Sequence, residues 1–439
     1  MEKTFSETLL RIGSQYSALP ALIQGDTVLT YEQLQERIFS RSEELKQEKY
    51  TCTGILGMPS VDWIVDMFAS AVAGKRTVLL DPSMNRQKQE ELIKAAGVNL
   101  VLPKNPGLAV CEECTPDEPG NLLFFTSGTT SFNKAVVLTQ EALLRSSWNG
   151  QQMLAAGTSD RVLAVLPMNH VFGFVCTLLW PLCNGSAVCI GRGLRKMAED
   201  PSFYHPTIIT AVPSLVKFLL AMNAYNAELR TILIGASPID RPTLALLRAK
   251  HIMVSFGYGL TETASGLAIS VDAEDPYGMK LCPDTRIRIG EDGTVFVRTP
   301  CMMKGYYHNP EATELVLDAG ELDTGDIGEL DENGLLRIKG RRNDVLVLPN
   351  GQKVYLPEWE GTLSESLKAE TAIVVEDGKL AAYTAGEKLE EDLWPKINEF
   401  NRKAGLGLQI SAVHVMKELP HTATGKLQRW LLKKENTEQ

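Results

Sequence analysis

The sequence predicts an α/β protein with a large N-terminal domain and a small C-terminal domain. Up to about residue 270, short β-rich runs alternate with stretches that carry apolar residues at helical spacing. Such alternation favours parallel sheets whose two faces are covered by helices. After Asp284 the pattern changes to hairpins, and a chain of 439 residues is too long for one compact core. We therefore expect roughly two or three folding units.

The first part of the chain consists of short strands and helices. Runs of β-branched and other apolar residues predict buried strands. These expected strands cover residues 78–80, 99–102, 162–166, 208–212, 232–234 and 252–255. Apolar residues at helical spacing predict helices over 86–96 and 213–225. We expect these elements to form parallel sheets covered by helices within about residues 1–270.

Two hairpin patterns follow. Strands are expected at 285–289 and 294–298, and again at 327–330 and 335–339, each pair joined by a turn rich in Asp, Glu, Asn and Gly. These hairpins predict a small β-barrel or sheet within about residues 271–342. A polar run at 340–344 is a plausible junction between domains. We expect residues 343–439 to form a separate small α+β domain.

Composition excludes several classes of protein. The net charge of −10 leaves no basic excess for neutralising nucleic-acid phosphates. No apolar run reaches the ~18 residues that a membrane-spanning helix needs, and the N-terminus lacks the apolar core of a signal peptide. Eight cysteines are scattered along the chain, and Cys111 and Cys114 form a CxxC pair with no second pair nearby, which is weak support for a zinc or redox role. We expect a cytoplasmic protein with reduced thiols and no integral membrane contact.

The segment from Thr126 to Lys134 predicts a polyphosphate-binding turn between two strands. It reads T-S-G-T-T-S-F-N-K and contains Thr126, Ser127, Gly128, Thr129, Thr130 and Lys134. Hydroxyls and backbone N–H groups can surround an oxyanion, and a lysine can neutralise part of its charge. It is not a Walker loop, because the lysine is spaced differently and a strand follows it in place of a helix. An ordinary turn rich in Ser and Thr is the alternative.

Two segments rich in small residues come directly after expected strands, where open α/β sheets bind ligands. Gly235, Ala236 and Ser237 could let a flat ring approach the backbone, although a structural turn would look the same. In the second segment, Gly257 and Gly259 flank Tyr258 and free its ring for stacking, and Thr261 and Glu262 follow. A threonine hydroxyl suits a phosphate and a carboxylate suits Mg²⁺. The alternative for Glu262 is a charge at the start of a helix.

Two later segments carry weaker signals. Asp326 follows Gly325 in a turn, where a carboxylate could accept hydrogen bonds from the vicinal hydroxyls of a ribose, but aspartate is common in turns without any ligand. Lys426 ends the loop that begins at Pro420, and most lysines of this kind are solvated. Each of these segments is weak evidence for a nucleotide site by itself and is supported only by the other motifs.

In order and spacing, these motifs resemble those of the adenylate-forming enzymes, which include acyl-CoA synthetases, adenylation domains and firefly luciferase. The resemblance runs from Leu29–Leu34 through Gly305-Tyr306-Tyr307 to Lys426. It implies a large N-terminal domain of two α/β subdomains and a β-barrel, followed by a mobile C-terminal domain. It also implies that a carboxylate attacks the α-phosphate of ATP to give an acyl-adenylate, from which a thiol then displaces AMP.

The resemblance also implies a role for each motif. The loop from Thr126 to Lys134 would hold the β- and γ-phosphates. Adenine would stack on Tyr258, next to Gly259, and lie along Gly235, Ala236 and Ser237. Thr261 would contact the α-phosphate and Glu262 would bind Mg²⁺, while Asp326 and Arg341 would hold the ribose. Lys426 would bridge the carboxylate and the α-phosphate, and Asn343 would be the hinge of the C-terminal domain.

The acid substrate is expected to be uncharged apart from its carboxylate. Pro167–Phe174 occupies the place of the P-x-x-H-x-x-G motif of acyl synthetases, so the resemblance gives an acyl pocket that includes His170, Phe172, Gly173 and Phe174. A core histidine is the alternative for His170. Amino-acid adenylation domains place an aspartate in this neighbourhood, and residues 162–180 contain none. The expected acid is fatty or aromatic.

Three functions stay open from the sequence. The first is a ligase that uses ATP, Mg²⁺ and CoA. The second is a freestanding enzyme that loads the pantetheine thiol of a separate acyl carrier protein. The third is a degenerate nucleotide-binding relative with little catalysis, because Ser131, Asn133 and Ala135 replace two glycines and a proline that relatives usually have. Retention of the lysines and carboxylates named above weighs against the third.

Overall fold

The computed structural model divides the chain into two compact units. Unit 1 comprises Met1–Arg286 and Val297–Leu322, and unit 2 comprises Ile287–Phe296 and Asp323–Gln439. The structure describes residues 1–112, 114, 117–126, 134–236, 239–272, 275, 277–342, 345–347, 353–376, 379–404, 409–421 and 427–432. The expected junction at residues 343 and 344 lies outside these ranges. The domain boundary at 342/343 therefore stays a prediction.

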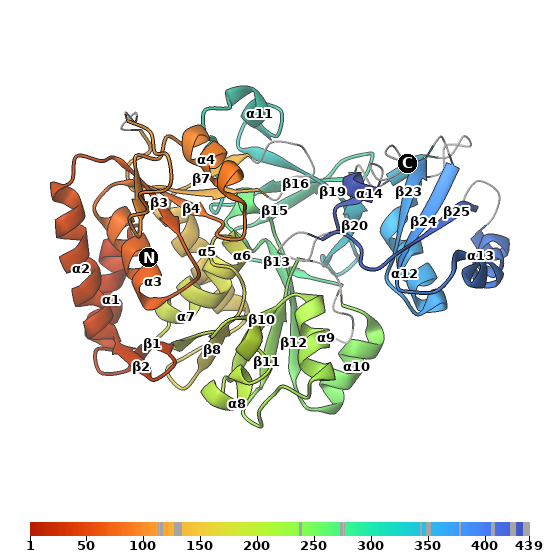
Figure 1. Ribbon diagram of the computed structural model, residues 1–439, viewed down its shortest axis with the longest axis horizontal. Coiled ribbons are helices and arrows are strands. Elements are labelled where there is room, and N and C mark those ends of the chain that lie inside the picture. The colour runs from red at the N-terminus through yellow and green to blue at the C-terminus, as the bar shows by residue number, and fades with distance from the viewer. Residues whose placement is uncertain are drawn as a thin grey trace. The chain divides into compact units, whose positions relative to one another are not determined.

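The larger sheet of unit 1 has nine strands in the order β14-β13-β12-β11-β10-β8-β9-β1-β2 (Figure 1). Its strands are β1 (Pro20–Gln24), β2 (Thr27–Thr30), β8 (Arg161–Ala164), β9 (Ala187–Ile190), β10 (Ile208–Ala211), β11 (Thr231–Ile234), β12 (Met253–Tyr258), β13 (Ala268–Val271) and β14 (Lys280–Leu281). The run from β12 to β1 is parallel, and antiparallel strands flank it at both ends. The carboxyl ends of these parallel strands therefore meet at one edge, which is where ligand-binding loops gather.

A second sheet of unit 1 has six strands in the order β17-β7-β6-β4-β3-β5. Its strands are β3 (Cys52–Leu56), β4 (Arg76–Leu80), β5 (Leu100–Leu102), β6 (Leu122–Phe125), β7 (Ala135–Leu138) and β17 (Gly305–Tyr306). Strands β3 to β6 pair in parallel, whereas β7 is antiparallel to both β6 and β17. Phe124 of β6 packs edge-to-face on Phe174, with ring centroids 5.4 Å apart. This aromatic pair connects the second sheet to a helical segment that packs on the first.

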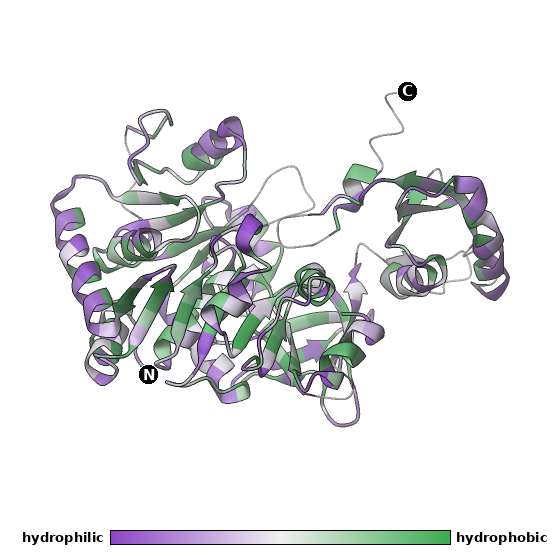
Figure 2. Ribbon diagram, turned by 60° about the horizontal axis from the view of Figure 1, so that its bottom comes forward, coloured by the Kyte–Doolittle hydropathy of each residue, from purple (hydrophilic) through white to green (hydrophobic). Residues whose placement is uncertain are grey.

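Helices cover these sheets, and their ends follow from local hydrogen bonding. They are α1 (Phe5–Gln15), α2 (Tyr31–Gln47), α3 (Val61–Val72), α4 (Arg86–Ala95), α5 (Gln140–Met153), α6 (Val171–Gly173), the π-helix η1 (Phe174–Leu179), α7 (Trp180–Cys183), the 3-10 helix η2 (Leu194–Lys196), α8 (Asp200–Tyr204), α9 (Pro213–Ala221), α10 (Arg241–Ala249), the 3-10 helix η3 (Thr261–Thr263) and α11 (Pro310–Glu314). Thr4 and Thr30 cap α1 and α2 in capping boxes with Glu7 and Gln33. Figure 2 shows apolar residues concentrated in the strands and polar residues on the outer faces of the helices. This division places the core between sheets and helices.

A five-stranded sheet occupies the part of the chain in which a barrel is expected. It has the order β15-β16-β19-β18, with β20 also pairing with β19. Its strands are β15 (Arg286–Ile289), β16 (Thr294–Arg298), β18 (Leu317–Asp318), β19 (Glu321–Leu330) and β20 (Leu336–Arg341). The two predicted hairpins are thus confirmed. Thr324 Oγ1 donates to the carbonyl of Val295 at 2.7 Å, which fixes β19 against β16.

The C-terminal part of unit 2 is a small α+β arrangement. Its elements are β21 (Val345–Val347), β22 (Lys353–Tyr355), α12 (Leu356–Leu367), β23 (Thr371–Glu376), β24 (Lys379–Ala385), α13 (Glu390–Ala404), β25 (Ile410–Met416) and α14 (Arg429–Leu432). The sheet β23-β24-β25 buries apolar side chains on both faces. Leu363, Leu367, Ile373 and Ile397 are essentially inaccessible in one of these cores. The buried residues of both cores belong to unit 2.

The predicted elements are confirmed, with shorter ends in places. Strand β8 ends at Ala164 where the sequence predicted residue 166, and α9 ends at Ala221 where it predicted residue 225. In the second case Met222 closes the helix and Asn223 adopts φ 51°. Within the described part of the chain, no helix combines the length and the apolar character that crossing a bilayer requires.

Candidate active site

The two ends of the predicted phosphate loop lie together at the end of a hairpin in unit 1. The backbone N–H of Thr126 donates to the carbonyl of Lys134 at 3.0 Å. This bond continues the β6–β7 ladder, in which Phe125 faces Ala135. Ser127, Gly128, Thr129 and Thr130 lie outside the described residues. The predicted turn between two buried strands is therefore confirmed at its base.

One tyrosine joins two residues that the sequence placed in separate motifs. Lys134 Nζ lies 4.6 Å from the centroid of the Tyr306 ring. The Tyr306 hydroxyl donates to Glu262 Oε1 at 2.8 Å. The backbone N–H of Met303 also donates to the Glu262 carbonyl at 2.8 Å. Tyr306 therefore contacts both the expected phosphate-binding lysine and the expected Mg²⁺ ligand. Its contact with Lys134 is a cation–π interaction, and its contact with Glu262 is a charge-assisted hydrogen bond.

Tyr306 is the functional candidate that the sequence reasoning missed. The segment Gly305-Tyr306-Tyr307 belongs to the part of the chain that resembles adenylate-forming enzymes, but its sequence alone indicates no chemical role. Tyr306 faces Val136 because β17 pairs with β7. These two strands are far apart in the sequence. A short two-residue strand gives no periodic signal. Its position next to Lys134 is therefore a product of tertiary pairing.

The turn after β12 presents Tyr258, Thr261 and Glu262, all of them half-buried. Gly259 makes this turn possible, because a Cβ at this position would lie 1.2 Å from the Ser265 carbonyl oxygen. The N–H of Leu267 donates to the Tyr258 carbonyl at 2.8 Å and closes the turn. Thr261 and Glu262 are the first two residues of η3. The three predicted residues thus lie at the end of β12 and at the start of η3.

Gly235 lies at the carboxyl end of β11 and contacts the predicted acyl pocket. Its N–H donates to the Ala211 carbonyl at 3.2 Å. A Cβ on Gly235 would lie 2.6 Å from Cζ of Phe172. Ala236 follows with φ 71°, and Ser237 lies outside the described residues. The structure thus places an expected adenine-lining residue directly against an expected acyl-pocket residue.

His170 precedes a helical segment that begins at Val171 and continues through a π-helix. Within the described residues, His170 Nε2 is buried without a hydrogen-bond partner. Burial lowers the pKa of His170, although the Asp81 charge acts in the opposite direction, so the ring is neutral at pH 7. π-helices of this kind are frequent at functional sites. An unpartnered buried nitrogen is the feature that a polar group of a ligand would satisfy.

Gly173 and Phe174 serve packing in this segment. A Cβ on Gly173 would lie 2.1 Å from the Pro167 carbonyl oxygen, so the helix can approach that loop only with glycine here. Phe174 is fully buried against Phe124. Their role as walls of an acyl pocket stays a prediction.

Asp326 and Arg341 form an ion pair within unit 2. They face each other across β19 and β20, and Arg341 Nε lies 2.8 Å from Asp326 Oδ1. The N–H of Asp326 donates to Thr324 Oγ1 at 3.1 Å, and Arg341 Nη1 donates to the Thr324 carbonyl at 3.2 Å. The Asp326 side chain is 5% exposed and that of Arg341 is 41% exposed. The pair predicted from the resemblance is therefore preassembled, with the arginine at the surface.

The loop that carries Lys426 has a well-defined base in unit 2, although residues 422–426 lie outside the described part, as does Asn343. His421 and Leu427 form a β-bridge, and Gln428 N–H donates to the Pro420 carbonyl at 2.8 Å. Arg429 pairs with the buried Glu360, with Nη2 2.5 Å from Oε2. These contacts hold both ends of the loop.

The donor set fits Mg²⁺ bound mainly by substrate phosphates. Among the described residues, no cluster of three or more His, Cys, Asp or Glu side chains could hold a metal ion. Mg²⁺ is usually held by one or two carboxylates together with phosphate oxygens and water. Glu262, whose Oε1 accepts a hydrogen bond from Tyr306, is a carboxylate of the kind that could take this place.

Known proteins resemble this chain in sequence and in fold. The pattern that describes AMP-binding enzymes matches residues 103–307. A 2-succinylbenzoate–CoA ligase of Listeria monocytogenes serotype 4b (strain F2365) is 30% identical over 332 residues, which are 72% of this chain and 70% of that protein. The crystal structure of the anthranilate CoA ligase AuaEII with anthranoyl-AMP superposes with a TM-score of 0.87 at 19% identity, over 99% of this chain and 98% of that one.

A further solved structure contains the nucleotide and the metal. The o-succinylbenzoate CoA synthetase MenE from Bacillus subtilis, in complex with ATP and magnesium ion, superposes with a TM-score of 0.84 at 23% identity, over 97% of this chain and 99% of that one. These two likenesses confirm the predicted fold class.

Proposed function

From the premise that this chain belongs to the family of AMP-binding enzymes, as an AMP-forming acyl-CoA ligase that uses ATP, Mg²⁺ and CoA, we propose that its acid substrate is aromatic. Two of the similar proteins above are named for aromatic acids, 2-succinylbenzoate and anthranilate. The ring of Phe172 packs against Gly235, which supports a pocket wall of aromatic character. The buried, unpartnered Nε2 of His170 supports a substrate that carries a polar substituent on its ring.

The observation that carries the nucleotide site is the chain of contacts from Lys134 through Tyr306 to Glu262. We assign Lys134 to the β- and γ-phosphates and Glu262 to Mg²⁺, which neutralises phosphate charge when it is bound. Tyr258 provides a face for adenine and Thr261 a hydroxyl for the α-phosphate. Tyr306 orients Glu262 and lies under Lys134, so it acts as a positioning residue. Negative charge that develops on the phosphate oxygens is thereby met by groups already in place.

Asp326 and Arg341 are assigned to the ribose. A carboxylate accepts hydrogen bonds from vicinal hydroxyls, and the ion pair with Arg341 at 2.8 Å keeps the Asp326 carboxylate ionised and oriented. Lys426 is assigned to the carboxylate and the α-phosphate, where one ammonium screens the repulsion between two anions. Its removal should therefore harm the first half-reaction selectively.

The acceptor is CoA, and the acyl-adenylate is its acylating partner. A separate carrier protein bears the same pantetheine thiol and is the alternative acceptor. We place the enzyme in the cytoplasm, where ATP and CoA are available; all eight cysteines are free in the structure, which agrees with a reducing compartment.

The test measures pyrophosphate release with a panel of acids, followed by addition of CoA or a holo carrier protein. We expect release with benzoates that bear polar substituents, and thioester formation with CoA. Release with fatty acids alone would contradict an aromatic substrate, and release without transfer to CoA would favour the carrier protein. No release with any acid would support a degenerate relative.

A matched variant locates the polar substituent. In His170→Phe the wall keeps its aromatic character but loses Nε2, so kcat/KM should fall by about tenfold for amino- or hydroxybenzoates and change little for benzoate itself. An equal loss for both acids would remove His170 from substrate recognition.

A further inference from the structure

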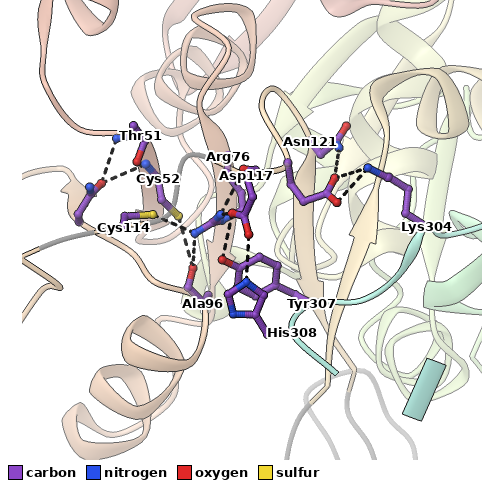
Figure 3. A network of polar contacts seen from close by, with 12 residues as sticks. Thr51, Cys52, Arg76, Ala96, Cys114, Asp117, Asn121, Lys304, Tyr307 and His308 are labelled. Carbon is purple, nitrogen blue, oxygen red and sulfur yellow. Dashed lines mark hydrogen bonds and ion pairs between the residues drawn. The ribbon is translucent and has the colours of Figure 1, made fainter. Parts of the chain in front are cut away.

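Two cysteines of unit 1 lie beside a buried arginine, and none of the three residues has a role in the function proposed above. Cys52 of β3 faces Arg76 of β4 across the parallel pair. Arg76 is 1% exposed, and its Nη2 donates to Cys114 Sγ at 3.0 Å and to the Ala96 carbonyl at 2.9 Å. A side-chain hydrogen bond joins the thiols of Cys52 and Cys114, whose sulfur atoms lie side by side in Figure 3.

The two sulfur atoms differ in charge and in access. The hydrogen bond with Cys52 and the Arg76 guanidinium lower the pKa of Cys114 to about 5. Cys114 is half-buried, whereas Cys52 is fully buried and its pKa is raised. A reactive cysteine is typically a thiolate in a positive, partly exposed environment. Cys114 meets this description, and Cys52 is a protonated thiol in contact with it.

We propose that Cys114 is a site of oxidation by hydroperoxides and that Cys52 is its resolving thiol. The Cys114 thiolate attacks one peroxide oxygen, the O–O bond breaks, and the departing hydroxide or alkoxide takes up a proton, which leaves a sulfenic acid. The Cys52 sulfur then attacks the Cys114 sulfur. The S–O bond breaks, the Cys52 proton and the hydroxide leave as water, and a disulfide forms. Overall, two thiols are oxidised and one peroxide is reduced to water or to water and an alcohol.

Cys111, the other member of the CxxC pair, does not share this environment. Its sulfur lies 3.8 Å from the Ile93 carbonyl, and burial raises the pKa of its thiol. It is therefore a protonated thiol close to the same segment, and Cys111→Ser is a matched control.

The modification is connected to the nucleotide site through the segment Lys304–His308. Arg76 lies 4.4 Å from the centroid of the Tyr307 ring and pairs with Asp117, whose carboxylate also contacts Tyr307 and His308 (Figure 3). Lys304 pairs with Glu118 at 2.7 Å. Tyr306, which holds Glu262, lies between these residues. Loss of the thiolate partner of Arg76 should therefore disturb Tyr307 and its neighbour Tyr306; this consequence rests on the proposed function.

The test treats the full-length protein with hydrogen peroxide at about pH 6, where an ordinary thiol is almost fully protonated. Peptide mapping after thiol blocking should show a Cys52–Cys114 disulfide in the wild type and in Cys111→Ser. In Cys52→Ser, a sulfenic acid should accumulate at Cys114 and be trapped by dimedone. Unmodified Cys114, or a Cys111–Cys114 disulfide in place of the predicted one, would overturn the proposal.

A separate binding measurement tests the consequence. ATP affinity, measured by calorimetry in Mg²⁺ buffer, should fall severalfold in the disulfide form and return after reduction. Cys114→Ser should show no response to peroxide. Unchanged ATP affinity in a fully disulfide-linked sample would overturn the link to the nucleotide site. If ATP fails to bind the reduced protein, the proposed function is contradicted, but the disulfide found by peptide mapping is still valid evidence for the oxidation site.

Discussion

At the scale of single residues, the account depends most on Tyr306. Its hydroxyl holds one oxygen of Glu262 and its ring contacts Lys134. Tyr306→Phe keeps the ring and removes the hydroxyl. A hydrogen bond to a charged group contributes about 1.5–3 kcal/mol, so the KM for MgATP should rise by roughly tenfold or more while the thermal midpoint changes little.

Tyr307→Phe is the matched control for this variant. It also loses one hydroxyl that bonds to a carboxylate, but that carboxylate belongs to Asp117. Because the Tyr307 ring that Arg76 contacts is kept, the KM for MgATP should rise far less than in Tyr306→Phe. Equal values of KM in the two variants would show that Tyr306 does not orient Glu262.

Cys114 gives a prediction of pH dependence. The groups around it are Cys52, Thr51, Arg76, Tyr307 and, farther off, Cys111. Because its pKa is lowered to about 5, Cys114 is already a thiolate above that pH, and its alkylation rate should be almost constant from pH 6 upward. In this range the thiolate fraction of an ordinary thiol rises about tenfold for each pH unit. A thiolate of low pKa is, however, a weaker nucleophile. Cys114 should therefore react about tenfold faster than Cys111 at about pH 6 and lose this lead at about pH 8.

Iodoacetamide labelling followed by mass spectrometry measures both rates in one sample. A rate at Cys114 that rises in proportion to hydroxide concentration would contradict the thiolate assignment.

The sequence indicated the chemical type of most candidate residues but not their contacts. Lys134 and Glu262 were each predicted from their own motif, because small residues, hydroxyls and charges within a few positions are a local signal. Their meeting at Tyr306 was not predictable, since β17 pairs with β7 across a long stretch of chain. The burial of Arg76 was not predictable either, because an arginine within a strand is usually expected at the surface.

At the scale of elements, the turn between β12 and η3 is the most constrained. A Cβ at position 259 would lie 1.2 Å from the Ser265 carbonyl oxygen, so Gly259→Ala requires the turn to move. We expect a loss of about 3 kcal/mol or more in the free energy of unfolding, together with loss of ATP binding. Urea unfolding followed by fluorescence measures the first quantity.

Gly266→Ala is the control, since nothing lies within 4 Å of a Cβ at that position. Its free energy of unfolding should stay within about 1 kcal/mol of the wild-type value, as expected for a glycine in an unstrained conformation. Similar destabilisation by both substitutions would show that the close contact at Gly259 does not shape the turn.

Elements were predictable where their pattern is local. The buried strands of the parallel sheet and both hairpins were expected from alternation and turn residues, and the structure has them. Strand β17 and the π-helix were not expected, because neither a two-residue strand nor a change of helical hydrogen bonding has a periodic signature. Both lie next to candidate site residues. Structure at functional sites often departs from what the local sequence pattern predicts, because tertiary contacts determine it.

At the scale of the whole molecule, the residues proposed for the nucleotide site belong to two compact units. Unit 1 holds Lys134, Tyr258, Thr261, Glu262 and Tyr306, and unit 2 holds Asp326, Arg341 and the base of the Lys426 loop. The fold class followed from the change of pattern near residue 284. The junction at Asn343 stays a prediction, because a hinge has no composition of its own beyond a polar run.

The measurement that tests the account most directly follows the two half-reactions separately in Lys426→Ala. Acyl-adenylate formation should fall by about 100-fold or more, because the ammonium that screens the two anions is gone. Thioester formation from supplied acyl-adenylate and CoA should largely survive, and Lys417→Ala, which removes an exposed lysine of the same unit, should leave both rates unchanged. An equal loss of both half-reactions in Lys426→Ala, or no loss in either, would contradict the account.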